Sequence, residues 1–119
     1  MRDHRSLHAW QEAQAVVLGS IDLVRGSWKR YAAALFSQLQ RASLSVQLNI
    51  AEGYAFGRSP TYTRHLRIAY GSAVETGEIL ETALKANVIP VDSGVRLLSR
   101  NRRTQRLLLG MLRSRHHGG

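Results

Sequence analysis

Mostly apolar or small residues recur every three or four positions through two central segments of the chain, and this spacing predicts long helices. We call each such row of residues, which would face a neighbouring helix, a seam. Within residues 32–55 the steps are four, three, four, three and four. This 3.5-residue repeat is typical of helices that pack side by side, nearly parallel. The alternation of Leu44, Val46, Leu48 and Ile50 also suits a strand, but it covers far fewer positions, so we predict helix. The two seams are Leu35, Leu39, Ala42, Val46, Asn49 and Gly53, and then Tyr62, Leu66, Ala69, Ala73, Thr76, Leu80 and Ala83.

Two further helices are expected from apolar spacing at the ends of the chain, so the four predicted helices span about 7–25, 32–55, 60–86 and 93–114. Gly26 and Ser27 break the helical pattern after the first predicted helix. Ser59 is suited to cap the third helix, and Pro60 to its first turn. Pro90 stops continuation, with Asp92 or Ser93 available as a cap. Short turns between helices of this length predict an all-α, up-down-up-down four-helix bundle in a single domain, residues 1–119.

The amino-acid composition and the distribution of apolar residues narrow the class of protein. There is no cysteine, which removes disulfides and thiolate chemistry and suits a reducing compartment. No apolar run approaches the roughly 20 residues that span a bilayer. The N-terminal "MRDHRSLHAW" lacks the apolar core of a secretory signal. We therefore expect a soluble, cytoplasmic protein with no membrane contact.

Charge is the strongest compositional signal. Lys and Arg total 17 against eight Asp and Glu, for a formal net charge of +9. Nearly all of these cations are arginine, whose planar guanidinium matches phosphate and carboxylate groups. One interpretation is an anionic partner. The other is that a GC-rich genome and a solvated surface produce the same bias.

The fourth predicted helix has charge of one sign only between Arg96 and Arg115. Seven arginines and no acid occur in this span. Arg96, Arg100 and Arg103 share one helix face, and Arg106 extends it. These cations repel one another unless an anion lies over them. Phosphates fit this role, and so do carboxylates of a neighbouring helix or subunit.

The stretch "GYAFGRSPTYTRH", residues 53–65, provides a second candidate rim. It interleaves aromatic rings with Arg58 and Arg64, a combination that suits stacking of unpaired bases. The structural alternative is that Tyr54 and Phe56 close the end of the bundle, with Tyr62 on the seam.

No pattern in the chain indicates an enzyme, a cofactor or a metal site. It contains no G-x-S-x-G elbow, no phosphate-binding P-loop and no Glu-x-x-His pair. His4 and His8 are four residues apart, but surface histidines explain them better than metal ligands do. For the acidic residues of the third helix we expect ion pairs with arginines on an adjacent helix or subunit. These residues are Glu75, Glu78 and Glu81.

A polar pair, Asn49 and Glu52, falls among apolar neighbours near the end of the second helix. An asparagine on a helical seam fixes the register between helices, and a buried one left unpaired costs about 1–3 kcal/mol. We interpret the pair as part of a structural polar network, with Arg41, Ser72 and Ser45 as the candidate partners.

Three stretches together resemble a known family. They are "LHAWQEA" (7–13), "SQLQRASLSVQLNIAEGYAFGRS" (37–59) and "YTRHLRIAYGSAVETGEIL" (62–80). They are similar to the four-helix-bundle proteins encoded in intervening sequences of bacterial 23S ribosomal RNA genes. The most specific part runs from Ser45 to Gly53. The chain departs from the family pattern at Gln47 and Leu48, where proline and serine are common, and in its Arg-rich fourth helix.

The resemblance implies a four-helix bundle that assembles into a ring-shaped homopentamer. It also implies a relation to the accessory protein of diversity-generating retroelements, a basic pentamer that binds nucleic acid and its reverse transcriptase. Combined with the arginines, this favours a non-enzymatic bundle that binds nucleic acid, RNA or single strands above all, through phosphate contacts. The alternative is a protein-interaction scaffold with an unidentified partner, whose arginines serve subunit contacts or an acidic protein.

Overall fold

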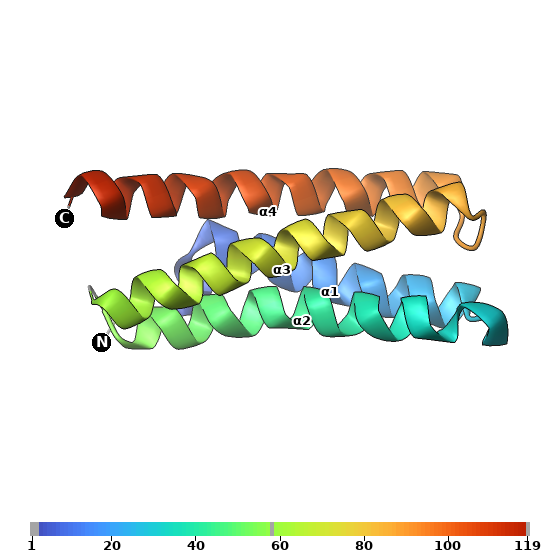
Figure 1. Cartoon of the computed structure of the whole chain (residues 1–119), viewed down its shortest axis with the longest axis horizontal. Helices are drawn as coiled ribbons and strands as arrows, with labels where there is room; N and C mark the ends of the chain where they lie inside the picture. The colour runs from blue at the N-terminus through green and yellow to red at the C-terminus, as the bar shows by residue number, and fades with distance from the viewer. Residues whose placement is uncertain (1–2, 58, 119) are drawn as a thin grey trace.

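Four antiparallel helices run the length of an elongated molecule of 45 × 23 × 21 Å (Figure 1). The structure, a computed structural model, describes residues 3–57 and 59–118, with side chains as far as residue 114. The elements are η1 (His4–Ser6), α1 (His8–Ser27), η2 (Arg30–Ala32), α2 (Ala33–Ala55), α3 (Pro60–Lys85) and α4 (Val91–Gly118). The four-helix, all-α architecture is therefore confirmed, and none of the described residues forms a strand.

The signals that end the helices are mostly those expected. Ser59 Oγ accepts a hydrogen bond from the Tyr62 amide at 3.2 Å, and Pro60 occupies the first position of α3. Asn87 adopts a φ of +58°, a left-handed conformation that asparagine tolerates after a helix end. Two expectations were wrong. Helix α4 begins at Val91, which places Asp92 inside its first turn, and it continues to Gly118 rather than ending near residue 114.

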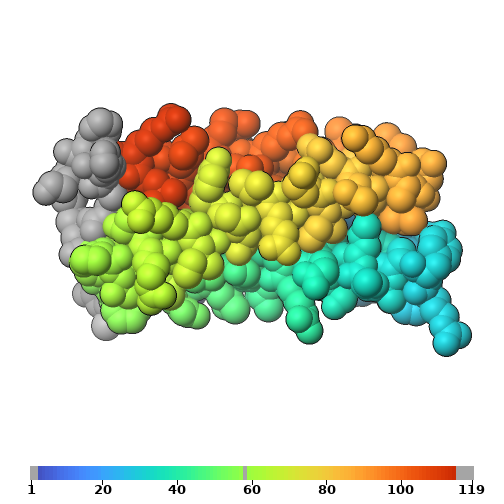
Figure 2. Space-filling model, viewed as in Figure 1, coloured from blue at the N-terminus to red at the C-terminus, as the bar shows by residue number. Residues whose placement is uncertain are grey.

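Helices α4, α3 and α2 are side by side on the face seen in Figure 2, and α1 lies behind them (Figure 1). Helix α3 crosses obliquely, beside α2 where it begins and beside α4 where it ends (Figure 1). Small seam residues permit this close crossing. A Cβ added at Gly53 of α2 would lie 2.8 Å from the Cβ of His65 on α3. No helix in the described part of the chain is long and apolar enough to cross a membrane.

Two hydrophobic clusters fill the interior, one toward each end of the bundle. Phe36, Leu39 and Leu80 belong to the cluster beside the α3–α4 turn, and Ile50 and Leu66 to the other. Buried polar residues lie between the clusters. The buried polar residues of the last three helices are Ser43 on α2, Thr76 on α3, and Asn101 and Thr104 on α4, and α1 adds Ser20 and Ser27.

Asn101 is the member of this polar layer that joins two helices. The hydroxyls of Ser43, Thr76 and Thr104 donate to carbonyls of their own helices. In contrast, Asn101 Nδ2 donates to the Ala73 carbonyl of α3 at 2.9 Å, and the residue is 1% exposed. Because one hydrogen-bond geometry defines one register, Asn101 sets how α4 is aligned along α3.

Candidate nucleic-acid interface

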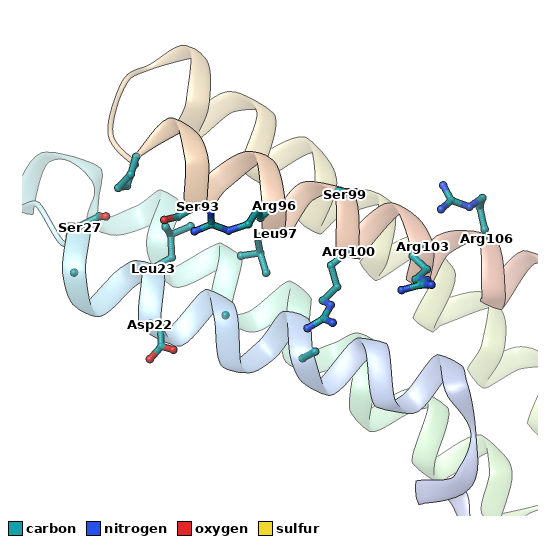
Figure 3. Close-up of a pocket in the computed structure, with 14 residues that line it drawn as sticks. Asp22, Leu23, Ser27, Ser93, Arg96, Leu97, Ser99, Arg100, Arg103 and Arg106 are labelled. Atoms are coloured by element: carbon teal, nitrogen blue, oxygen red, sulfur yellow. The ribbon is translucent and has the colours of Figure 1, made fainter.

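A groove of about 880 Å³ runs between α1 and α4, and all four arginines of the expected row line it (Figure 3). The α1 side contributes mainly small residues, including Ala15, Gly19 and Gly26. Ser27 and Pro90 mark the end of the groove beside the turns. The arginines that line it are Arg96, Arg100, Arg103 and Arg106.

Small residues on α1 are what create this groove. An added Cβ at Gly19 would lie 2.7 Å from Cδ1 of Leu97, so glycine lets this leucine pack directly against the α1 backbone and form the floor. At Gly26 no described atom outside the neighbouring residues and the local helix backbone lies within 4 Å of an added Cβ, so the groove is open there. The chain thus buries Leu97 while leaving the space above it accessible.

The arginine row is exposed, and only its middle is neutralised. Glu12 of α1 lies opposite Arg100 and Arg103. The Arg100 Nε to Glu12 Oε2 distance is 3.0 Å, and the Arg103 Nη1 to Glu12 Oε1 distance is 3.3 Å. Arg96 and Arg106 form no ion pair with any described residue, and in Figure 3 Arg106 points away from α1. The row therefore retains two uncompensated guanidinium groups, one at each end.

Glu12 was not among the residues expected from the sequence, although it explains how the arginines coexist. Its side chain is 16% exposed, whereas those of Arg100 and Arg103 are 51% and 63% exposed. Its buried Oε2 lies within ion-pair distance of Arg100 without a well-aligned hydrogen bond. An acid 91 residues from Arg103 in the chain gives no local signal of this contact, which exists only because α1 and α4 are adjacent.

The second predicted rim lies away from the groove. Arg64 is exposed on α3 and does not line the groove, and Arg58 lies outside the described residues. Tyr62 is buried, and Tyr54 packs against the hydrophobic cluster that contains Ile50 and Leu66. Both observations favour the alternative that these rings close the end of the bundle. Phe56 remains 58% exposed and stacks on His65 with ring centroids 5.9 Å apart.

Only part of the expected polar network is present. Asn49 Nδ2 donates to the Ser45 carbonyl at 2.9 Å, and the hydroxyls of Ser45 and Ser72 are 2.8 Å apart. His65 Nδ1 completes the network, 2.8 Å from Asn49 Oδ1. Glu52 and Arg41 were wrongly included, because both face solvent and neither contacts the network.

The acids of α3 separate into two groups. Glu81 pairs with Arg102 of α4 at 3.0 Å, as expected. Glu75 and Glu78 are exposed and make no ion pair within the described part of the chain. Among the same residues, no three His, Asp or Glu side chains are grouped so that they could hold a metal ion. Near the N-terminus, the His4 ring packs edge-on against Trp10 at 5.2 Å.

Fold and groove together define the class of this protein, a basic four-helix bundle with an arginine-lined groove between its first and last helices. The family model of the 23S rRNA-intervening sequence protein matches residues 5–110, so the chain belongs to that family. A comparison with curated proteins finds no match.

Proposed function

We propose that this protein is a non-enzymatic nucleic-acid-binding bundle whose contacts are made by the arginine row in the α1–α4 groove. The observation that carries the proposal is the four arginines along one groove edge, of which only the middle two pair with a described acid, the largely buried Glu12. From Arg96 to Arg106 the helix advances about 15 Å. One strand of B-form nucleic acid presents about four phosphates over that length, at roughly 3.4 Å each.

The balance of charge in the groove supports phosphate as the ligand. Asp22 also lines the groove, but it pairs with Arg25 at 3.6 Å and points away from α4 in Figure 3. Guanidinium groups spaced along a helix match a run of phosphates, because each is permanently charged and offers several donors. A nucleic-acid backbone therefore satisfies the groove better than one small anion does.

The test is fluorescence anisotropy of labelled single-stranded RNA, single-stranded DNA and duplex DNA, titrated across salt. If four phosphates are neutralised, the log–log slope of affinity against salt is about −2.8 on single strands and about −3.6 on duplex. Absence of binding to all three probes at about 50 mM salt would contradict the proposal.

Glu12→Gln is expected to tighten nucleic-acid binding and to weaken the bundle. The substitution frees Arg100 and Arg103 for phosphates, so we expect affinity to rise about three- to tenfold. The lost ion pairs are more than half exposed on the arginine side, so the free energy of unfolding should fall by only about 1 kcal/mol. Anisotropy and thermal melting measure the two effects.

Glu78→Gln is the matched control for this change. It removes the same charge from an exposed α3 residue that makes no ion pair with the described residues. We expect no change in melting and little change in affinity. If Glu12→Gln leaves affinity as unchanged as this control does, the row is not the binding surface.

A second candidate function is a protein-interaction scaffold, and the Glu12 contacts favour it because they show a carboxylate binding this row. An acidic protein segment would then replace the nucleic acid. Failure of every nucleic-acid probe, with the fold intact, is the outcome that favours this candidate.

We also propose that the chain assembles with copies of itself, as a pentamer by resemblance to the family. Support comes from apolar side chains that remain exposed on the α2–α3 face: Leu44, Leu48, Ile68 and Val74. Light scattering on the purified chain tests this proposal, and a mass of one chain would contradict it.

A further inference from the structure

The end of the groove beside the turns carries hydroxyl groups as well as a cation. Ser27 of α1 lines the groove there, together with Ser93 and Arg96 of α4. In Figure 3 the hydroxyls of Ser27 and Ser93 point toward each other from the two helices, and the Arg96 guanidinium group lies beside Ser93. Hydrogen-bond donors of three residues are therefore gathered at one end of the groove.

Ser27 is the member of this group that lacks a partner within the protein. The residue is only 7% exposed, yet its Oγ makes no hydrogen bond with any described residue, and its carbonyl alone is bonded, to Lys29. Largely buried hydroxyls are normally hydrogen-bonded, because an unpaired one has lost its water without compensation. Since Ser27 lines the groove, a group bound in the groove can accept this hydrogen bond.

The first turn of α4 adds partial positive charge at the same place. The helix begins at Val91, and the amide of Gly94 donates to the Pro90 carbonyl at 2.9 Å. The amides that precede Gly94 in the helix have no carbonyl partner within it, and the Pro90 side chain has no oxygen that could cap them. Such a helix end favours a negative charge nearby.

The charged side chains around this end leave the donors unoccupied. Arg96 forms no ion pair with any described residue. Asp22 lines the groove but pairs with Arg25 and points away from α4 in Figure 3. Asp92, in the first turn of α4, is exposed and does not line the groove. A ligand that is anionic and offers several acceptor oxygens fits this arrangement.

We infer that this end of the groove binds the terminal phosphate of a nucleic-acid strand, whose internal phosphates then follow the arginine row. The inference rests on the proposed nucleic-acid function. A terminal phosphate monoester carries a charge of about −1.5 to −2 at pH 7 and three strong acceptor oxygens. An internal phosphate carries a single negative charge and has fewer free oxygens. The donors of Ser27, Ser93 and Arg96 match the terminal group, whereas a single arginine is enough for an internal one.

The test compares strands that differ only at their ends. One single-stranded oligonucleotide is prepared unmodified, with a 5′-phosphate and with a 3′-phosphate, and each version carries its fluorophore on an internal base. We expect at least one phosphorylated strand to bind about tenfold more tightly than the unmodified strand at the same salt concentration. The end at which the phosphate has this effect gives the direction of the strand in the groove.

The variant Ser27→Ala/Ser93→Ala removes both hydroxyls without changing the charge of the protein. The quantity compared is the ratio of the affinities for the phosphorylated and unmodified strands, so a general weakening of binding cancels. We expect this ratio to fall from about ten to below about two. Ser37→Ala/Ser114→Ala is the matched control, because both serines are exposed and lie outside the groove, and it should keep the full ratio.

The two proposals fail in different ways. If the natural chain binds all three strands equally, the terminal-phosphate inference is overturned and the arginine function stands. A tenfold ratio that persists in Ser27→Ala/Ser93→Ala also overturns it, because the phosphate is then bound elsewhere. Absence of binding to every strand overturns both proposals. Thermal melting of each variant confirms that the bundle is folded.

Discussion

The double variant Arg96→Glu/Arg106→Glu is expected to bind single-stranded nucleic acid about 100-fold more weakly than the natural chain at ~0.1 M salt. These residues are the two ends of the row that Glu12 does not reach. Each substitution removes one phosphate contact and introduces a repulsive charge. Both side chains are exposed and make no ion pair with the described residues, so the bundle should melt as before.

The control for this experiment separates the groove from overall charge. Each Arg→Glu change alters the formal charge by −2, so either double variant falls from +9 to +5. Arg41→Glu/Arg67→Glu makes the same change on exposed residues of α2 and α3 that do not line the groove. We expect this control to lose only a few-fold in affinity. An equal loss in both variants would show that the groove has no special role.

Asn101→Ala is expected to lower the free energy of unfolding by about 2–3 kcal/mol, measured by urea denaturation. The substitution removes the hydrogen bond to Ala73 and leaves a small cavity in a fully buried layer. Asn101 also lies 3.5 Å from Gln105 Oε1, so that amide loses a partner as well.

Gly77 provides a second variant that tests the same contact. A Cβ added there would lie 3.3 Å from Asn101 Nδ2, so Gly77→Ala alone crowds the amide. In the Asn101→Ala background this space is free, and alanine should stabilise the helix by about 1 kcal/mol relative to glycine. An identical effect of Gly77→Ala in both backgrounds would mean that the two residues do not interact.

The contrast between Asn49 and Asn101 shows what helical spacing in the sequence can and cannot predict about a polar residue. Both asparagines occupy positions on an apolar helical stripe, and that signal is visible in the sequence. Asn49 is only half-buried and bonds within a network that includes His65. Asn101 is the fully buried one, and it bonds across to α3. Spacing identifies such positions, but the depth of burial depends on where a third and a fourth helix lie.

For the charged residues, too, some features follow from the sequence and others depend on the tertiary structure. That Arg96, Arg100, Arg103 and Arg106 share a face follows from helical geometry alone. The sequence predicted that the acids of α3 pair with arginines on an adjacent helix or subunit, and Glu81 does pair with Arg102 of α4. Glu52 was assigned to a polar network because its neighbours in sequence are apolar, and Arg41 was named as a candidate partner for it, yet both residues are exposed. Sequence neighbours on a helix point in different directions, so local composition does not determine burial.

The sequence by itself determined the four helices, nearly all of their boundaries and the one-signed charge of the last helix, because helical period, capping and charge are local properties of the chain. Only the tertiary structure decided that the arginines border a groove and that Glu12 lies opposite the middle of the row. These features depend on which side of α1 faces α4. That choice is made by packing, where glycine at position 19 admits Leu97 and the space above it stays open.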